Sequence, residues 1–188
     1  MTEKAETAQP HAAPVEVDAA LQAAVREIEA HASEAGWDQP ARLYALVPTS
    51  DLLAREPALA AAMGLDEVAA AGTLTPVEQD DVPVDEALES VLARIMWPAE
   101  VLGCAAVVER LVLPPAADGH LPDDPEAAEQ YAADHPERQE VRIVAGATRD
   151  GATYCALRMR THDDAFSVLE SPDLVPALVD LLRSTLEN

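Results

Sequence analysis

The chain has 188 residues, a formal net charge of −23 and a pI near 4.2. Such an excess of carboxylates disfavours nucleic acids and anionic membrane surfaces as partners, because binding to either requires clustered Lys and Arg. No apolar run approaches the roughly 20 residues of a membrane span and no segment resembles a secretion signal, so we expect a cytoplasmic protein whose acidic surface suits solubility or a basic protein partner.

The N-terminal part of the chain divides into a tail and a helix. Residues 1–13 mix Thr, Glu, Ala, Gln and Pro without a hydrophobic period, which predicts a disordered tail. Residues 14–188 are expected to form one domain. It begins with apolar residues at helical spacing from Val17 to Ala32, with Asp18 as a start and Gly36 as an end.

The next elements are shorter. Residues 42–47, Arg-Leu-Tyr-Ala-Leu-Val, favour a strand, and Pro48–Asp51 offers residues that could cap a following helix. That helix is expected to be interrupted near Pro57. Residues 73–79 resemble a strand, which Pro76 confines to a sheet edge because proline cannot donate to the ladder.

The middle of the chain holds the longest apolar run. Helical spacing predicts a helix over residues 81–96, which ends at Trp97-Pro98 because the residue before proline is disfavoured in helical space. The valines of residues 101–113 and the two prolines that follow favour a central strand over a buried helix. Residues 114–138 form an acidic excursion between strands, with a short helix opening at Pro125, and its length fits either a lid or a spacer.

Two alternating apolar runs flank residues 149–151 and predict a β-hairpin. A two-residue turn would set apolar residues opposite polar ones along the whole pair. A three-residue loop instead places Thr148 opposite Ala152 and matches the apolar residues of both strands. It needs a left-handed residue at the third loop position, which is where Gly151 lies, so we expect the three-residue loop.

The same register determines which charges meet on the other face of the hairpin. Arg142 falls directly opposite Arg158, and Glu140 falls opposite Arg160. Opposed like charges destabilise a sheet unless something separates them. Three interpretations follow: arginines splayed into solvent, an internal carboxylate such as Glu109, or an external anionic group bound at Arg142, Arg158 and Arg160. The third would make these arginines an anion-binding site.

The chain closes with a leucine stripe from Leu174 to Leu186, which predicts a helix that begins near Val175, next to Pro176. Its leucines are expected to pack across the apolar face of the hairpin. Together the elements predict an α+β fold: a single domain with a mainly antiparallel sheet, a C-terminal β-hairpin, and flanking N- and C-terminal amphipathic helices.

Motifs for catalysis or cofactor binding are missing from the sequence. It contains no glycine-rich phosphate loop, H-E-x-x-H, G-x-S-x-G or C-x-x-C, and Lys4 is its only lysine. The His and Asp residues at 162–164 and 120–124 are expected to be polar loop residues rather than metal ligands. We therefore predict no catalytic residue, no metal site and no cofactor.

Four further residues are interpreted as core. Cys104 and Cys155 fall in apolar strand patterns and are expected to be reduced, buried thiols rather than a disulfide or nucleophiles. Trp37 and Trp97 each lie close to a proline and are expected to anchor helices against the sheet rather than to form a ligand platform.

Three segments carry a resemblance to a known family. They are the hairpin, residues 96–115 (MWPAEVLGCAAVVERLVLPP) and residues 160–164 (RTHDD). They resemble an uncharacterised family of proteins from high-GC Gram-positive, actinobacterial bacteria, which has no established activity. The order of elements is more loosely similar to the α+β arrangement of type III secretion chaperone-like and YbjN-like proteins, and that likeness implies a protein that binds other proteins.

The sequence thus favours a non-enzymatic cytoplasmic protein that acts through protein–protein contact, as a chaperone-like module or a homodimer. The alternative is a small enzyme or ligand-binding protein that uses the face of Arg142, Arg158 and Arg160 for an anionic group. A structural role without any ligand is the third possibility.

Overall fold

The computed structural model describes residues 18–68, 70–79, 82–83, 86–114, 117 and 120–187, so the tail expected over residues 1–13 lies outside the described residues. The helices are α1 (Ala19–Glu34), α2 (Thr49–Arg55), α3 (Pro57–Ala62), α4 (Leu88–Leu92), α5 (Pro125–Asp134), the short 3₁₀ helix η2 (Ala165–Ser167) and α6 (Pro176–Leu186). The strands are β1 (Arg42–Pro48), β2 (Leu74–Gln79), β3 (Gly103–Val112), β4 (Gln139–Thr148), β5 (Thr153–Met159) and β6 (Leu169–Ser171).

All six strands join one antiparallel sheet in the order β2-β1-β3-β4-β5-β6, which confirms the predicted α+β class. The long apolar run forms β3, and it lies inside the sheet between β1 and β4 as expected. β2 lies at one edge, where Pro76 faces Leu46 without having to donate to a further strand. The three-residue strand β6 forms the other edge.

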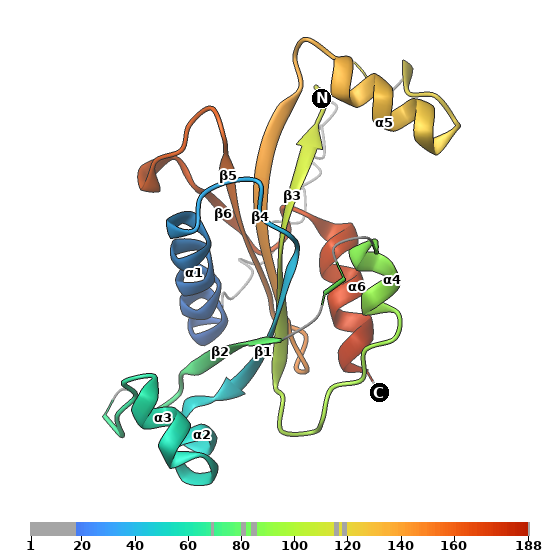
Figure 1. Ribbon diagram of the computed structural model, residues 1–188. Helices are drawn as coiled ribbons and strands as arrows, with labels where there is room; N and C mark the ends of the chain where they lie inside the picture. The colour runs from blue at the N-terminus through green and yellow to red at the C-terminus, as the bar shows by residue number, and fades with distance from the viewer. Residues whose placement is uncertain are drawn as a thin grey trace, which may run out of the picture.

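Helices cover both faces of this sheet (Figure 1). α6 and α4 pack on one face, against alternate residues of the inner strands such as Cys104, Ala106 and Ile143. α1 packs on the opposite face, against the intervening residues, which include Ala105 and Val144. The two-residue period of the strands therefore produces two separate apolar layers, one per face. The α6 layer contains Leu178, Leu182 and Leu186, as the leucine stripe predicts.

Small residues let α1 approach the sheet closely. The helix begins at Asp18, whose carboxylate accepts the backbone N–H of Leu21 at 2.7 Å, as expected for an N-cap. Beneath it lies Gly146 of β4, where an added Cβ would come within 2.9 Å of Val25 and 3.0 Å of Leu21. The alanine-rich composition thus permits tight packing of helix on sheet at the cost of side-chain bulk.

The hairpin register is confirmed. Ala145 pairs with Cys155 and Ile143 with Leu157, while the Thr148 N–H donates to the Ala152 carbonyl at 2.9 Å. Gly151 has a φ of 93° in the third loop position, a conformation that side chains with a Cβ rarely adopt.

The excursion between β3 and β4 carries α5, which begins at Pro125 as expected. Asp124 caps it by accepting the Ala127 N–H at 2.9 Å. None of the residues of α5 is buried, and Figure 1 shows this helix at the far end of the β3–β4 ribbon, away from α2 and α3.

Two local expectations are wrong. The helix expected over residues 81–96 is reduced to α4, because Trp97 turns into the core, where its indole N–H donates to Thr185 Oγ1 at 2.9 Å. Residues 81, 84 and 85 of that stretch lie outside the described residues. No side chain caps α2. The Thr49 hydroxyl instead bonds with Thr75 and Thr73, both at 2.8 Å, because the adjacent β2 segment supplies a better placed partner.

Candidate functional site

The sheet register brings two of the three predicted site residues together on the face covered by α1. Arg142 of β4 pairs with Arg158 of β5, as expected. Arg142 is 1% exposed and Arg158 is 5% exposed. The solvent-splayed interpretation is therefore wrong for these two side chains, because guanidinium groups removed from water require partners.

Arg142 is held by the carboxylate of Glu109, the internal partner that the strand pattern indicated. Its Nη2 donates to Glu109 Oε1 at 2.9 Å and its Nε at 3.2 Å. Nη2 also donates to the Gly36 carbonyl, just beyond the end of α1. The guanidinium carbon lies 4.4 Å from the centre of the Trp37 ring, a cation–π distance.

One donor of Arg142 has no protein partner. Among the described residues, Arg142 Nη1 is the buried side-chain nitrogen or oxygen that lacks a hydrogen bond. A cavity of about 10 Å³ lies beside Arg142 and Glu109. That volume suits a single water molecule, and it is too small for a metabolite.

Arg158 is paired across the helix–sheet interface. Its Nε and Nη2 donate to the two carboxylate oxygens of Glu29 on α1, at 2.6 and 3.0 Å. Nη1 donates to Asp163 at 3.2 Å. These bonds, chiefly those to Glu29, raise the pKa of Arg158 above its ordinary value, although burial acts in the opposite direction.

Arg160 completes the group at its solvent-facing end. It donates two bonds to Asp38, at 2.8 and 2.9 Å, and a third to Glu140. Hydrogen bonding by Arg160 lowers the pKa of Asp38. The backbone of Asp38 has a φ of 65°, and its N–H donates to Glu109 Oε2 at 2.8 Å. Arg160, which binds the Asp38 side chain, and Glu109, which accepts the Asp38 N–H, thus hold this unusual backbone conformation in place.

We call Arg142, Arg158, Arg160 and Trp37, with their carboxylate partners, the arginine cluster. In the described part of the chain, five carboxylates pair with its three guanidinium groups: Glu29, Asp38, Glu109, Glu140 and Asp163. The cluster is therefore acidic on balance, and each arginine already has an internal counter-charge.

The sequence prediction missed three carboxylates of this cluster: Glu29, Asp38 and Asp163, the last of which was expected only as a polar loop residue. Glu29 follows Val25 by four residues, so it lies on the apolar stripe of α1, and a carboxylate on such a stripe indicates a buried partner. Asp38 follows Trp37 in the connection after α1, where no periodic pattern reveals a role. Trp37 was expected as a core anchor, and it is instead a half-buried platform for two arginines.

A fourth arginine, Arg149, binds main-chain carbonyls rather than carboxylates. Its Nε donates to Val101 at 2.9 Å, its Nη2 to Trp97 at 3.0 Å and to Pro98 at 3.2 Å, and its Nη1 to Leu186. Leu186 is the last residue of α6, where carbonyl groups lack helical partners and attract a cation. Arg149 therefore joins the hairpin loop to the end of α6.

The two cysteines are buried free thiols, as expected. Burial raises the pKa of Cys104 to about 11 and also raises the pKa of Cys155. Burial and a raised pKa both disfavour the thiolate, so neither residue is suited to nucleophilic chemistry.

An apolar strip remains uncovered on the α6 face of the sheet. α6 packs chiefly against β3 and β4, so β5 and β6 extend beyond it. Leu157 of β5 pairs with Leu169 of β6, which is 48% exposed. We define the β5–β6 strip by the half-buried Leu157, Met159 and Leu181 and the exposed Leu169 and Leu174.

The turn that precedes β6 presents one more apolar side chain. Phe166, the only phenylalanine of the chain, lies on η2 and is 100% exposed. Asp164 caps this turn, since its carboxylate accepts the Phe166 N–H at 2.9 Å and the Ser167 hydroxyl at 2.6 Å. These two hydrogen bonds hold the turn that carries Phe166.

Residues 21–187 match the family model described as PPA1309-like protein. The chain belongs to the PPA1309-like protein family. That description names no activity, in agreement with the resemblance that the sequence segments indicated. No curated protein and no solved structure matches this PPA1309-like chain.

Asp163, in the loop before η2, makes two contacts within the arginine cluster of this PPA1309-like chain. Asp163 accepts the Trp37 indole N–H at 2.9 Å in addition to its bond with Arg158. Across the described ranges, no three His, Cys, Asp or Glu side chains gather in a way that could hold a metal ion. Within those same ranges, no helix has the length and apolarity needed to cross a membrane.

Proposed function

We propose that the protein is a non-enzymatic cytoplasmic module that binds another protein along the β5–β6 strip, in a chaperone-like manner. The observation that carries this proposal is the strip itself. Half-buried and exposed apolar side chains from β5, β6, the turn after β6 and α6 lie at one edge of the sheet, and apolar surface patches mark sites of protein contact. We also propose an actinobacterial origin for the protein, on the basis of the hairpin and residues 96–115 and 160–164.

The charge of the protein defines the kind of partner. A second copy of this chain would bring a further net charge of −23 to the complex. A partner with an apolar centre and a basic rim would instead be attracted and oriented by the acidic surface. We therefore favour a basic protein over a homodimer.

The polar groups of the protein support binding rather than catalysis. The arginines of the cluster are paired with internal carboxylates, and both thiols are buried and have a raised pKa. A general acid, base or nucleophile needs a group that is accessible and only partly satisfied.

Site-specific photo-crosslinking tests this proposal. A photoreactive amino acid replaces Leu169 or Leu174 in the full chain, expressed in its native cytoplasm. We expect one discrete adduct from both positions and none from Asp180, which lies on α6 with its side chain 74% exposed. A basic protein in the adduct supports the proposal, whereas an adduct of twice the chain mass identifies a homodimer. Equal crosslinking from Asp180 contradicts the proposed strip.

A matched variant separates binding from folding. Leu169→Glu/Leu174→Glu adds two charges at exposed positions, so its thermal unfolding should match that of the wild type while the adduct formed from a probe at Met159 disappears. Persistence of the adduct in this variant would contradict the strip as the contact surface.

An anion site at Arg142, Arg158 and Arg160 is the alternative function. The unpartnered Nη1 of Arg142 favours it, because a buried donor without a partner would gain a hydrogen bond from an anionic oxygen. Inorganic phosphate and sulfate are suitable probes. Under this alternative they raise the unfolding temperature of the wild type, and the rise is lost in Arg160→Gln, whose side chain is accessible. Arg183→Gln, which changes a matched exposed arginine on α6, should keep the rise. A rise that survives in Arg160→Gln would reveal a general salt effect instead.

A further inference from the structure

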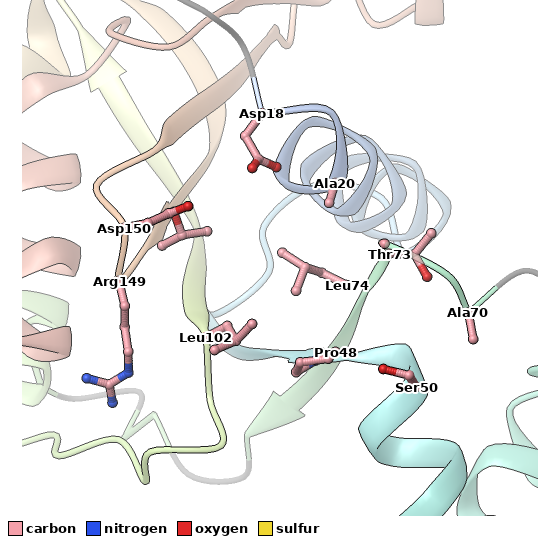
Figure 2. A pocket seen from close by; sticks show the side chains of 12 residues that line it. Asp18, Ala20, Pro48, Ser50, Ala70, Thr73, Leu74, Leu102, Arg149 and Asp150 are labelled. Carbon is pink, nitrogen blue, oxygen red and sulfur yellow. The ribbon is translucent and has the colours of Figure 1, made fainter.

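A cavity of about 380 Å³ lies at the N-terminal end of α1, whereas the arginine cluster lies beyond the C-terminal end of that helix. Figure 2 shows the side chains around it, which come from α1, β2, the start of α2, the segment before β3 and the hairpin loop. Ala20, Pro48, Leu74 and Leu102 provide apolar walls. The volume lies near the lower end of the roughly 300–1,000 Å³ typical of small-molecule sites.

The charged groups that line this cavity are two carboxylates and one guanidinium. Asp18 uses Oδ1 to cap α1, and Asp150 uses Oδ1 to accept the Thr148 hydroxyl, which leaves Oδ2 of each carboxylate outside these bonds. Arg149 does not balance them. Its guanidinium points away from the cavity in Figure 2, toward the main-chain carbonyls that it binds at the end of α6.

We propose that this cavity binds a small organic ammonium ion with an apolar body. The apolar walls would take the hydrocarbon part of the ligand, and the two carboxylates would attract its charge. The N-terminus of α1 favours anions by itself, but the Asp18 carboxylate already occupies that position. Anionic ligands are disfavoured here, so the site differs in chemistry from an anion site at the arginine cluster.

Three probes of similar size test the ligand class: 2-phenylethylammonium, 2-phenylethanol and 3-phenylpropanoate. Binding to the full chain is followed by ¹H–¹⁵N NMR at the amides of Gly72, Leu102 and Asp150, which lie around the cavity. We expect the ammonium probe to bind about tenfold more tightly than the alcohol, and the carboxylate to bind less tightly than either. Equal affinity for the ammonium and the alcohol, or no shift with any probe, would overturn the proposal.

Asp18→Asn/Asp150→Asn removes both charges and keeps the hydrogen bonds, because asparagine is as good an N-cap as aspartate and retains an acceptor oxygen. We expect this variant to bind the ammonium and the alcohol equally, with its unfolding temperature close to that of the wild type. Asp180→Asn/Glu137→Gln changes the net charge equally at exposed sites outside the cavity and should keep the tenfold preference. A preference that survives in the first variant or disappears in the second would overturn the assignment.

Discussion

Glu29 of α1 and Arg158 of β5 form a two-point ion pair in the interface between the helix and the sheet. The two donor–acceptor distances are 2.6 and 3.0 Å, and both side chains are buried. The pair allows β5 to hold a charged residue on the face covered by α1, next to Ala156 of the apolar layer. It also selects the orientation of α1, because only one rotational setting of the helix brings Glu29 over Arg158.

Glu29→Gln should lower the free energy of unfolding by about 3 kcal/mol, because it leaves the buried guanidinium of Arg158 without its main counter-charge. Asp163 remains in contact and limits the loss. Urea unfolding measures the change. Glu27→Gln, an exposed change on the same helix, should stay within about 0.5 kcal/mol of the wild type. Equal effects of the two substitutions would mean that the pair does not stabilise the fold.

Gly146→Ala should destabilise the protein by about 1–2 kcal/mol, because the new Cβ would lie 2.9 Å from Val25 Cγ2 and α1 would have to shift. The valine side chain is stiff and cannot turn away freely. Adding Val25→Ala should recover part of this loss, so the double variant should be more stable than the sum of the single changes predicts. A double-mutant cycle by urea unfolding checks this, and strict additivity would count against the close contact.

Arg149→Lys should cost about 2 kcal/mol of stability even though it keeps the charge. Lysine has one ammonium group and cannot reach the carbonyls of Val101, Trp97, Pro98 and Leu186 together, as the planar guanidinium does. Thermal unfolding measures the loss. Arg183→Lys, on the exposed side of α6, should leave the unfolding temperature unchanged. A tolerated Arg149→Lys would show that charge alone accounts for the role of Arg149.

The ion pair between Glu170 and Arg26 should make part of the stability depend on pH. Hydrogen bonds from Arg26 lower the pKa of Glu170. A carboxyl with a lowered folded-state pKa stabilises the fold fully above its unfolded value, about 4.3, and loses that contribution as the pH falls through the folded-state pKa. The stability difference between wild type and Glu170→Gln should therefore be largest near pH 7 and shrink toward pH 3.

Urea unfolding at several pH values measures this difference. The control is Glu34→Gln, an exposed change at the end of α1. A difference between wild type and Glu170→Gln that stays constant from pH 7 to pH 3 would exclude the pair with Arg26 as its source.

Several features of the fold could be predicted because two independent constraints agreed on them. In the hairpin, the apolar alternation selects a three-residue loop, and Gly151 supplies the left-handed conformation that this loop requires. A shift of one residue would turn every apolar side chain to the wrong face. The contact between Arg142 and Glu109 comes from a second register, that of β3 with β4, in which Glu109 faces Arg142.

Other features depend on contacts between distant segments, which local patterns do not contain. Helical spacing extends well past α4, but the bond between Trp97 and Thr185 of α6 determines where the chain leaves the helix. Asp38 joins the arginine cluster only because the connection after α1 returns to the end of β3. The apolar cavity at Asp18 was not predicted either, because its walls come from five separate parts of the chain.

The two edges of the sheet have a consequence for the behaviour of the protein at high concentration. Open strand edges recruit further strands and so start fibrous aggregates. Here Pro76 removes a donor from the β2 edge, and the β6 edge offers only Leu169–Ser171, with Glu170 engaged by Arg26. Neither edge is a long, flat template. At high concentration, the protein should therefore resist edge-to-edge pairing of its sheets, even though it exposes apolar side chains elsewhere.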